Sequence, residues 1–576
     1  MRLTPAGWFL IVILLVACPL AGVVSYAYLT AQRIGPFGPQ PTAVAGLPTA
    51  RTGSLPTATA LGNAAAAPTP TPTKNLGVVP ATVGPTSAPL TPAATAAAAP
   101  TTPPAASASP AALPTVSVAY DAYAPYFPVR VATQLGLDKQ NGIALKPIPF
   151  DFDGKNSYSE AQRRQAVKDG SFDVLLTTLD AVALFPDDQT GKVVAIVDES
   201  AGADKIVARA PIARLNDLKG KRITYSEGSV SEYFLYSNLS LVGLTPQDVK
   251  LVPADNIDEA VSLFKAGNAD ALVGWEPTID DALQQPNVKV LIGSDNYRTI
   301  LDVVVASDKA LKEKPQAIQG FVNTWFAALK VMTDDPQQAG QAVVQSGDPD
   351  WTGIAKPDDL TQQLGLVAQA TLAQNQVALG DPTTLADRIR ETQQTWKNGG
   401  KQVANLDPAQ LVDTRFVLAA AQQPALASTK PPVNASFVLT SRIQLPKLSS
   451  DQAGKAQAVA ELPLKFIQFE PDSAVITAQS KQDLLQQVVP VLKKTPGLYL
   501  KVDGMAAKPL GVSDADVEQT ARDRTNAVIS FLAGQGIDPN RLIGGTLPPE
   551  HPNSTDENVL KQDRKVVFTL VMPSGT

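Results

Sequence analysis

The chain has 576 residues and a mass of 60.5 kDa, a length that indicates about two to four domains. Its hydrophobic content of 44% is enough for buried cores, whereas a net charge of −6 excludes the basic surface that nucleic-acid binding needs. The chain has a single cysteine, which excludes a disulfide framework within it. This cysteine and the single histidine together are too few ligands for a typical zinc site. We therefore expect no cofactor, no metal and no nucleic-acid partner.

The first element in chain order is an uncharged apolar segment at residues 8–31, roughly two dozen residues long and sufficient to span a bilayer. Tryptophan and tyrosine stand near its ends, where aromatic belts occur. Two export interpretations stay open. The length favours an uncleaved signal anchor at 1–34, whereas the sequence LVAC ending at Cys18 resembles a lipobox. Both interpretations place the rest of the chain outside the cytoplasmic membrane.

Residues 35–114 consist largely of proline, alanine, threonine, serine and glycine, with stretches such as TPTPTPT. Such a composition offers too little apolar surface for a core, and repeated proline blocks both helix and sheet. We expect an extended, disordered tether that holds the folded part away from the membrane.

From residue 115 the pattern alternates between apolar strands and amphipathic helices. Predicted strands cover 117–123, 143–152, 172–182 and 192–200, and predicted helices cover 128–142 and 159–170. The same alternation continues through 221–244, 249–277 and 288–295. Strands separated by single helices indicate an α/β fold with a parallel sheet, in which ligands bind at the carboxyl ends of the strands.

Several motifs of this region occur in a recognisable order. LKGKRITYSEGS at 218–229 precedes a helix, and DEAVSLFKAGNADALVGWEP occupies 258–277. Together with AVKDGSFDVLLTTLDA at 166–181, they resemble the substrate-binding proteins of ABC importers for nitrate, sulfonate, taurine and thiamine precursors. The resemblance covers about 115–422. It implies the two-lobed periplasmic-binding-protein (flytrap) fold, with a small-molecule solute bound between the lobes and an ABC permease as partner.

Strand-end geometry then selects the candidate ligand-binding residues. The first lobe supplies Tyr120, Asp121, Tyr123, Thr177, Thr178 and Asp180, with Tyr126 beside them. The second lobe supplies Ser226, Gly228, Ser229, Ser231, Trp275 and Glu276, and Asp302 comes from the returning strand. The serine-rich turn offers N–H and O–H donors to an anion, although a simple helix cap explains each serine equally well. The acidic residues suit a cationic group instead, and the sequence leaves that conflict open.

After a proline-bearing linker at 423–455, a second folded unit is expected at 456–576. The pattern predicts, in this order, the strand LKFIQFEPDSAVI, a helix to about residue 494, the strand GLYLKVDG, the helix RTNAVISFLAGQG and the strand DRKVVFTLVM. This β-α-β-α-β order resembles the smaller α+β OmpA-like peptidoglycan-binding domain. The resemblance implies that Arg524 and Arg564 contact peptidoglycan.

One departure from that family weakens the expected wall site. The family's threonine–aspartate pair aligns with Ala506 and Ala507, so the carboxylate that would meet the ammonium of diaminopimelate is missing. Arg524 is still able to pair with a ligand carboxylate, and Asp514 or Asp516 on the longer loop is a possible substitute.

The chain contains no motif that carries enzyme chemistry: no nucleophile elbow, phosphate loop, HExxH or CxxC. His551 lies in a polar loop and is expected to be solvated. We therefore predict a non-enzymatic, exported, membrane-anchored solute-binding protein for an ABC importer, tethered toward the cell wall. The alternative is an envelope structural or sensory protein, in which a degenerate flytrap domain links membrane and peptidoglycan.

Overall fold

The computed structural model describes residues 112–150, 158–184, 191–403, 407–437, 439, 443–464, 466–470 and 473–573. The predicted membrane segment with Cys18 and nearly all of the predicted tether lie outside these residues. Within the described ranges, no helix is both long and apolar enough to cross a membrane.

The first lobe is built on a six-stranded sheet with the order β11-β4-β10-β3-β1-β2. Its strands are β1 (Thr115–Tyr120), β2 (Ala144–Pro149), β3 (Val174–Thr178), β4 (Gly191–Ser200), β10 (Leu301–Ser307) and β11 (Val367–Gln369). These strands are rich in valine, leucine and isoleucine, and β10 is buried along its whole length, as expected for strands covered on both faces.

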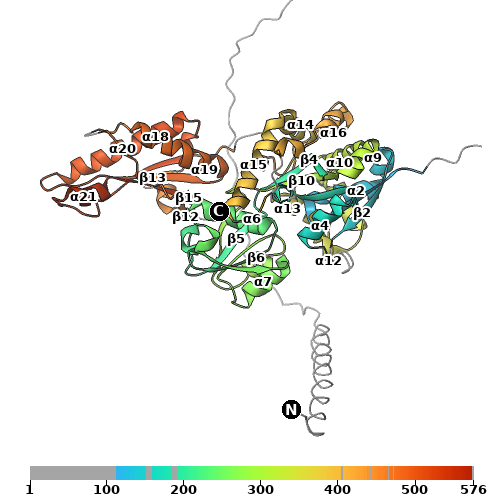
Figure 1. The fold of residues 1–576 in the computed structure, drawn as a ribbon, viewed down its shortest axis with the longest axis horizontal. Coiled ribbons are helices and arrows are strands. Elements are labelled where there is room, and N and C mark those ends of the chain that lie inside the picture. Colours follow the sequence, from blue (N-terminus) through green and yellow to red (C-terminus); the bar gives the residue numbers. More distant parts are fainter. Residues whose placement is uncertain are drawn as a thin grey trace, which may run out of the picture. The chain divides into compact units, whose positions relative to one another are not determined.

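The second lobe is built on a five-stranded sheet with the order β7-β6-β8-β5-β9. Its strands are β5 (Asp204–Arg209), β6 (Arg222–Ser226), β7 (Lys250–Ala254), β8 (Ala271–Trp275) and β9 (Val288–Gly293). Helices α6 (Val230–Leu241) and α7 (Ile257–Lys265) connect these strands and pack on the sheet (Figure 1).

The chain crosses between the lobes twice, at 201–203 and at 294–300, which defines a two-lobed α/β fold. The parallel pairing expected from the sequence holds for β1, β2 and β3 and for β6, β7 and β8, but not at these crossings. β10 runs antiparallel to both β3 and β4, and β5 runs antiparallel to β8 and β9, because a strand that returns from the other lobe enters the sheet in the opposite direction.

Two predicted elements of the first lobe differ in detail. The helix expected at 128–142 is interrupted at Gly136, whose positive φ of 68° ends α2 (Pro128–Leu135) before α3 (Leu137–Gln140) begins. The strand expected at 172–182 ends at Thr178, and α5 (Leu179–Ala183) follows at once. Asp180 therefore lies on a helix, not at the end of a strand.

After β10 the chain adds a series of helices to the first lobe. They are α9 (Asp308–Glu313), α10 (Pro315–Asp334), α11 (Pro336–Gln345), α12 (Pro349–Thr352), α13 (Pro357–Leu364), α14 (Leu372–Gly380), α15 (Pro382–Asn398) and α16 (Arg415–Ala420). Proline at the first position of many of them supplies the fixed φ that favours a helix start. α15 differs from the others because it packs on α5 of the first lobe and on α6 of the second.

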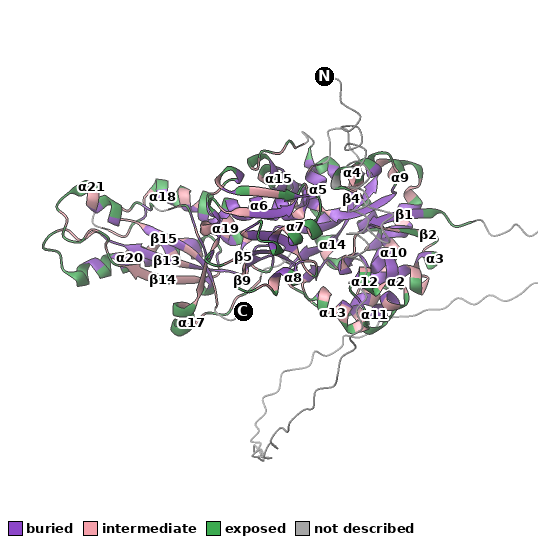
Figure 2. Cartoon of the chain, turned by 90° about the horizontal axis from the view of Figure 1, so that it is seen from below, coloured by how far each residue is buried: buried purple, intermediate pink, exposed green. Residues whose placement is uncertain are grey.

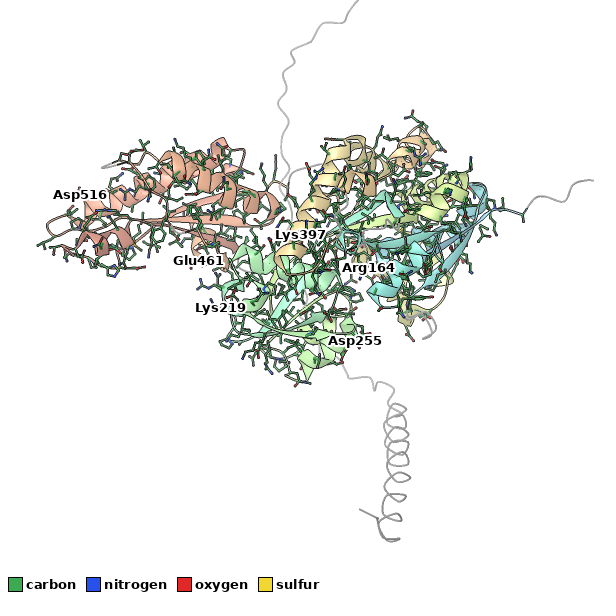
Figure 3. All side chains as sticks on the ribbon, viewed as in Figure 1. Arg164, Lys219, Asp255, Lys397, Glu461 and Asp516 are labelled. Atoms are coloured by element: carbon green, nitrogen blue, oxygen red, sulfur yellow. The ribbon has the colours of Figure 1, made fainter. Side chains whose placement is uncertain are left out.

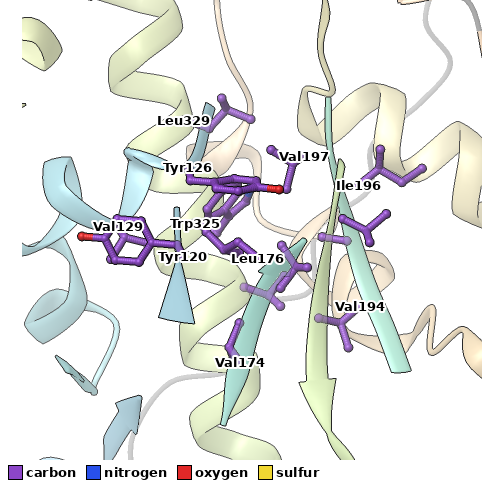
Figure 4. Packing of buried hydrophobic residues seen from close by; sticks show 14 of the residues in the cluster. Tyr120, Tyr126, Val129, Val174, Leu176, Val194, Ile196, Val197, Trp325 and Leu329 are labelled. Carbon is purple, nitrogen blue, oxygen red and sulfur yellow. The ribbon is translucent and has the colours of Figure 1, made fainter. Parts of the chain in front are cut away.

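The core of the first lobe joins strand valines to aromatic side chains. Tyr126 lies close to Trp325 and Leu329 of α10 and to Val197 of β4 (Figure 4). Figure 2 shows β4 as buried, whereas the short helix α17 (Ser450–Lys455) is exposed.

The C-terminal module carries a four-stranded sheet with the order β12-β15-β13-β14. Its strands are β12 (Gln457–Glu461), β13 (Tyr499–Met505), β14 (Leu542–Leu547) and β15 (Val566–Met572), and its longest helices are α18 (Ala478–Asp483), α19 (Val489–Lys494) and α20 (Asp514–Gly534). The sequence pattern predicts no strand between the long helix and the final strand, but β14 lies there. Gly545 stands where a Cβ atom would meet Asp503 at 2.1 Å, so the strand needs glycine for close approach rather than as a turn.

The C-terminal module and the second lobe share one hydrophobic cluster within the compact unit Ala105–Thr576. The Asn216 side chain donates to the Glu461 carbonyl (3.0 Å) and accepts from the Glu461 N–H (2.8 Å), as a neighbouring strand would. Figure 3 labels Glu461. Part of the segment expected as a linker is also held in place, because Phe437 is fully buried in the core of the first lobe.

Candidate functional site

The crossing between the lobes is held by a buried serine. The Ser294 hydroxyl accepts hydrogen bonds from the backbone N–H of Gly202 (2.8 Å) and of Asp204 (3.2 Å), and it lies 2.8 Å from the Ser200 hydroxyl. Ser200 in turn donates to the carboxylate of Asp204 at 2.7 Å. Both crossing segments therefore meet in one polar cluster.

Two carboxylates lie side by side next to this crossing. Asp198 on β4 and Asp302 on β10 are paired in the antiparallel register, and both are buried. Tyr123 donates its hydroxyl to Asp198 Oδ1 at 3.3 Å, and Tyr126 donates to Asp302. Asp198 Oδ2 has no hydrogen-bond partner among the described residues.

Burial raises the pKa of both carboxyls well above the usual range, and the neighbouring charge of Asp204 adds to the rise. Asp204 is itself raised to a pKa of about 6, chiefly by burial. Asp198, Asp204 and Asp302 therefore form a buried group with too few cationic neighbours to stabilise three negative charges. Such a group favours either a bound proton or an arriving cation.

A cavity of about 220 Å³ lies between the lobes, beside these residues. Tyr123 and Pro125 supply the side of the first lobe, Ala203 marks the crossing, and Glu276 and Asp280 come from the second lobe. The described residues that line the cavity include three carboxylates, the third being that of Asp359, and no lysine or arginine.

Two ion pairs reduce the charge of this lining, and one of them joins Lys356 to Asp359 at 3.9 Å. Lys205 on β5 forms an ion pair with Glu276, both side chains being largely buried. The carboxylate of Asp280 forms no ion pair among the described residues. Burial and the charge of Glu276 raise its pKa, and the charge of Lys205 only partly opposes that rise. An ammonium group in the cavity would relieve this repulsion.

The remaining predicted residues of the first lobe lie around this site but do not line its cavity. Tyr120 is buried, with its ring 5.8 Å from that of Trp351 in an edge-on arrangement. Asp121 pairs with Arg163 at 2.7 Å. Thr177 and Thr178 end β3, in register with β10 beside Asp302.

In the serine-rich turn of the second lobe, hydrogen-bond donors already bind other groups of the chain. Ser229 caps α6 by accepting from Ser231 N (3.2 Å), and it donates to the Ser226 carbonyl (2.8 Å). Gly228, with φ of 70°, donates its N–H to the carboxylate of Glu232 at 2.7 Å. A carboxylate of the chain therefore occupies the position that a bound anion would take.

Glu232 is a buried residue that sequence reasoning missed. It accepts from the Tyr236 hydroxyl (2.5 Å) and pairs with Lys401 at 2.8 Å. A glutamate three residues after a capping serine is the signal that could have identified it. Asp198 and Asp204 were missed as well, although Asp198 belongs to a DES sequence that closes a buried strand.

Trp275 ends β8, where its Cα is paired with that of Asp204. It is half-buried and stands next to Glu276, but it does not line the cavity. Of the predicted ligand residues, Tyr123 and Glu276 are the two that the structure brings to the cavity.

The candidate residues of the C-terminal module do not line the interlobe cavity. The guanidinium of Arg524 lies 5.0 Å from the ring centre of Phe469, and Ala507 follows the end of β13 half-buried. Arg564 pairs with Glu557 on the surface. His551, expected as solvated, is half-buried and lies 3.0 Å from Asp563.

Among the described residues, Glu550, His551 and Asp563 form a group able to hold a metal ion. Their present partners oppose that role. Asp563 already accepts from the backbone N–H groups of Glu550 and His551, and Lys565 pairs with Glu550 at 2.7 Å.

Known proteins match parts of the two-lobed region in sequence. Residues 159–339 match the family model described as NMT1/THI5 like. A putative aliphatic sulfonates-binding protein of Escherichia coli is 28% identical over 169 residues, which cover 26% of this chain and 52% of that protein. The taurine-binding periplasmic protein of Escherichia coli is 26% identical over 238 residues, which cover 38% and 69% of the two chains.

A crystal structure of the periplasmic aliphatic sulphonate binding protein from Escherichia coli aligns with a TM-score of 0.40 and 19% identity, over 52% of this chain and 92% of that one. The chain spans about half the length of the first curated relative. Over the matched region it is similar to extracytoplasmic solute-binding proteins of ABC importers, and the prediction of a binding protein rather than an enzyme is confirmed. The family match ends before the C-terminal module.

Proposed function

We propose that this chain is a membrane-anchored solute-binding protein whose interlobe cavity takes a small solute with an ammonium group, for delivery to an ABC permease. The observation that carries the proposal is the lining of the cavity, which includes three carboxylates and no lysine or arginine among its described residues. Glu276 and Asp359 each have a lysine partner outside the lining, whereas Asp280 has no ion pair among the described residues. A bare anion would be repelled there, whereas an ammonium group gains charge-assisted hydrogen bonds.

The solute class follows from joining this charge pattern to the comparisons. The relatives are named for aliphatic sulfonates and for taurine, and taurine carries an ammonium and a sulfonate on a two-carbon chain. In such an amino-sulfonate, the ammonium would face Glu276 and Asp280, and the sulfonate would accept from the side-chain amides of Gln362 and Gln363, which also line the cavity. A volume of about 220 Å³ suits a solute of this size better than a drug-sized ligand.

The second part of the proposal concerns attachment to the envelope. Residues 8–31 would anchor the chain in the membrane, and the C-terminal module would act as an OmpA-like domain that contacts peptidoglycan weakly through Arg524. The four-stranded sheet with a long helix between β13 and β14 supports this assignment. The absence of an aspartate at Ala507 is the reason for expecting weak contact.

Native mass spectrometry of the full chain purified from cells tests the function. We expect a co-purified solute of low mass, which is lost in Glu276→Gln and kept in the matched control Glu313→Gln, an exposed residue of α9. A chain that carries no solute and binds none from a panel of amino-sulfonates, sulfonates and amines would favour the structural alternative.

A further inference from the structure

A second and larger cavity, of about 480 Å³, lies away from the interlobe cavity. It is bordered by the end of β4, the crossing segment before β10, helix α15, and α19 of the C-terminal module. None of its lining residues is shared with the interlobe cavity.

The charged side chains of this cavity are mostly cationic. Glu199 lies 3.7 Å from Arg298 and 3.6 Å from Arg388, and Glu391 lies 3.3 Å from Lys494. Lys493 also lines the cavity, and it has no ion-pair partner among the described residues. The lining therefore contains four cations, Arg298, Arg388, Lys493 and Lys494, and only two carboxylates, Glu199 and Glu391.

Each of the two arginines has a buried Nε donor without a hydrogen-bond partner among the described residues. Arg298 is 4% exposed; it donates to the Ser436 hydroxyl at 2.9 Å, and its Nε has no hydrogen-bond partner in the described part of the chain. Arg388 donates to the Arg298 carbonyl at 2.8 Å, and its Nε is likewise without a partner there. An incoming acceptor would be favoured because it would give these buried donors a hydrogen-bond partner.

One wall of the same cavity is apolar. Leu485, Val489 and Pro490 line it from the helix that ends in α19. A site with cations on one side and aliphatic side chains on the other selects a ligand with both characters.

We infer that this cavity is a second binding site, for a small organic anion whose carboxylate or phosphate meets Arg298, Arg388 and Lys494 and whose apolar part covers Leu485 and Val489. The site joins the hinge of the two-lobed region to the C-terminal module. Its occupant would therefore strengthen the contact between them. This inference does not depend on the proposed function of the interlobe cavity.

Isothermal titration calorimetry on the full chain tests the inference with matched probes. Phenyl phosphate carries both parts of the expected ligand, inorganic phosphate lacks the ring, and phenol lacks the charge. We expect phenyl phosphate to bind at least about tenfold more tightly than either partial probe, because only it uses both walls of the cavity. Benzoate, tested in parallel, shows whether a carboxylate replaces the phosphate.

Variants then locate the binding. The double variant Lys493→Gln/Lys494→Gln should weaken phenyl phosphate about tenfold, a loss of about 1.4 kcal/mol, whereas Lys447→Gln/Lys481→Gln, a matched pair of exposed lysines, should not. Leu485→Ala should weaken phenyl phosphate but not inorganic phosphate. Saturating taurine should leave the phenyl phosphate titration unchanged. No binding of any probe, or binding that both double variants affect equally, would overturn the inference.

Discussion

Trp396 donates its indole N–H to the backbone carbonyl of Asp180 at 3.1 Å, and this contact ties α15 to α5 of the first lobe. The same ring packs against Tyr233 and Tyr236 of α6 in the second lobe, with ring centres 5.7 and 5.9 Å away. One fully buried side chain therefore touches both lobes.

Trp396→Ala should destabilise the chain by about 3–5 kcal/mol, because it removes a fully buried aromatic side chain from the junction of the lobes. Urea unfolding followed by circular dichroism measures this loss. Trp396→Phe keeps most of the ring and should cost less, with the loss of the hydrogen bond to Asp180 as the main term. A loss below about 1 kcal/mol for the alanine variant would show that the lobes are held together elsewhere.

Asp204 should make stability fall as pH rises. Burial raises its pKa from 3.8 to about 6 in the folded chain, so the folded state holds the proton more tightly than the unfolded state. Its stabilising contribution is complete below about pH 4 and is lost as pH rises through about 6. The rise in the pKa of Asp204 from 3.8 to about 6 on folding corresponds to a fall of about 3 kcal/mol in the free energy of unfolding over this pH range.

Asp204→Asn should therefore remove about 3 kcal/mol of the fall in unfolding free energy between about pH 4 and pH 7. Urea unfolding across that range measures the slope for both chains. Asp255→Asn, which changes an exposed aspartate, should keep the slope of the parent chain. An unchanged slope in Asp204→Asn would mean that this carboxyl does not gain its proton on folding.

Ser229→Ala tests whether the serine-rich turn binds solute or only caps α6. Its hydroxyl is engaged by Ser231 N and by the Ser226 carbonyl, so we expect a stability loss of about 1 kcal/mol with little change in solute affinity. Ser307→Ala removes the corresponding cap of α9 and should cost a similar amount. A tenfold loss of affinity in Ser229→Ala alone would place the hydroxyl on the solute.

The C-terminal module should bind peptidoglycan weakly, and sedimentation of the full chain with purified peptidoglycan measures it. Arg524→Ala should abolish the binding, because the guanidinium is the group expected to meet a ligand carboxylate. Ala507→Asp should strengthen it about tenfold to a hundredfold by supplying a partner for the ligand's ammonium. Strong binding that Arg524→Ala leaves unchanged would mean that the module contacts its partner through another surface.

Hydrophobic runs predicted most strands of the two lobes, because a buried strand needs a continuous apolar sequence. The side chains of the site depend on pairings that no local pattern contains. Asp198 meets Asp302 only because the returning strand β10 enters the sheet next to β4. We assigned Asp180 to a strand end because TTLDAV continues an apolar run. In the structure a helix starts after Thr178, and Asp180 on that helix does not line the cavity.

The acidic lining of the interlobe cavity is tested most directly by comparing taurine with ethanesulfonate, which lacks only the amine, in calorimetric titrations of the full chain. Taurine should bind about tenfold to a hundredfold more tightly, because its ammonium gains charge-assisted hydrogen bonds from Glu276 and Asp280. Asp280→Asn should remove most of that difference, whereas Asp255→Asn should not. Ethanesulfonate binding as tightly as taurine, or more tightly, would contradict the proposal that the cavity selects an ammonium group.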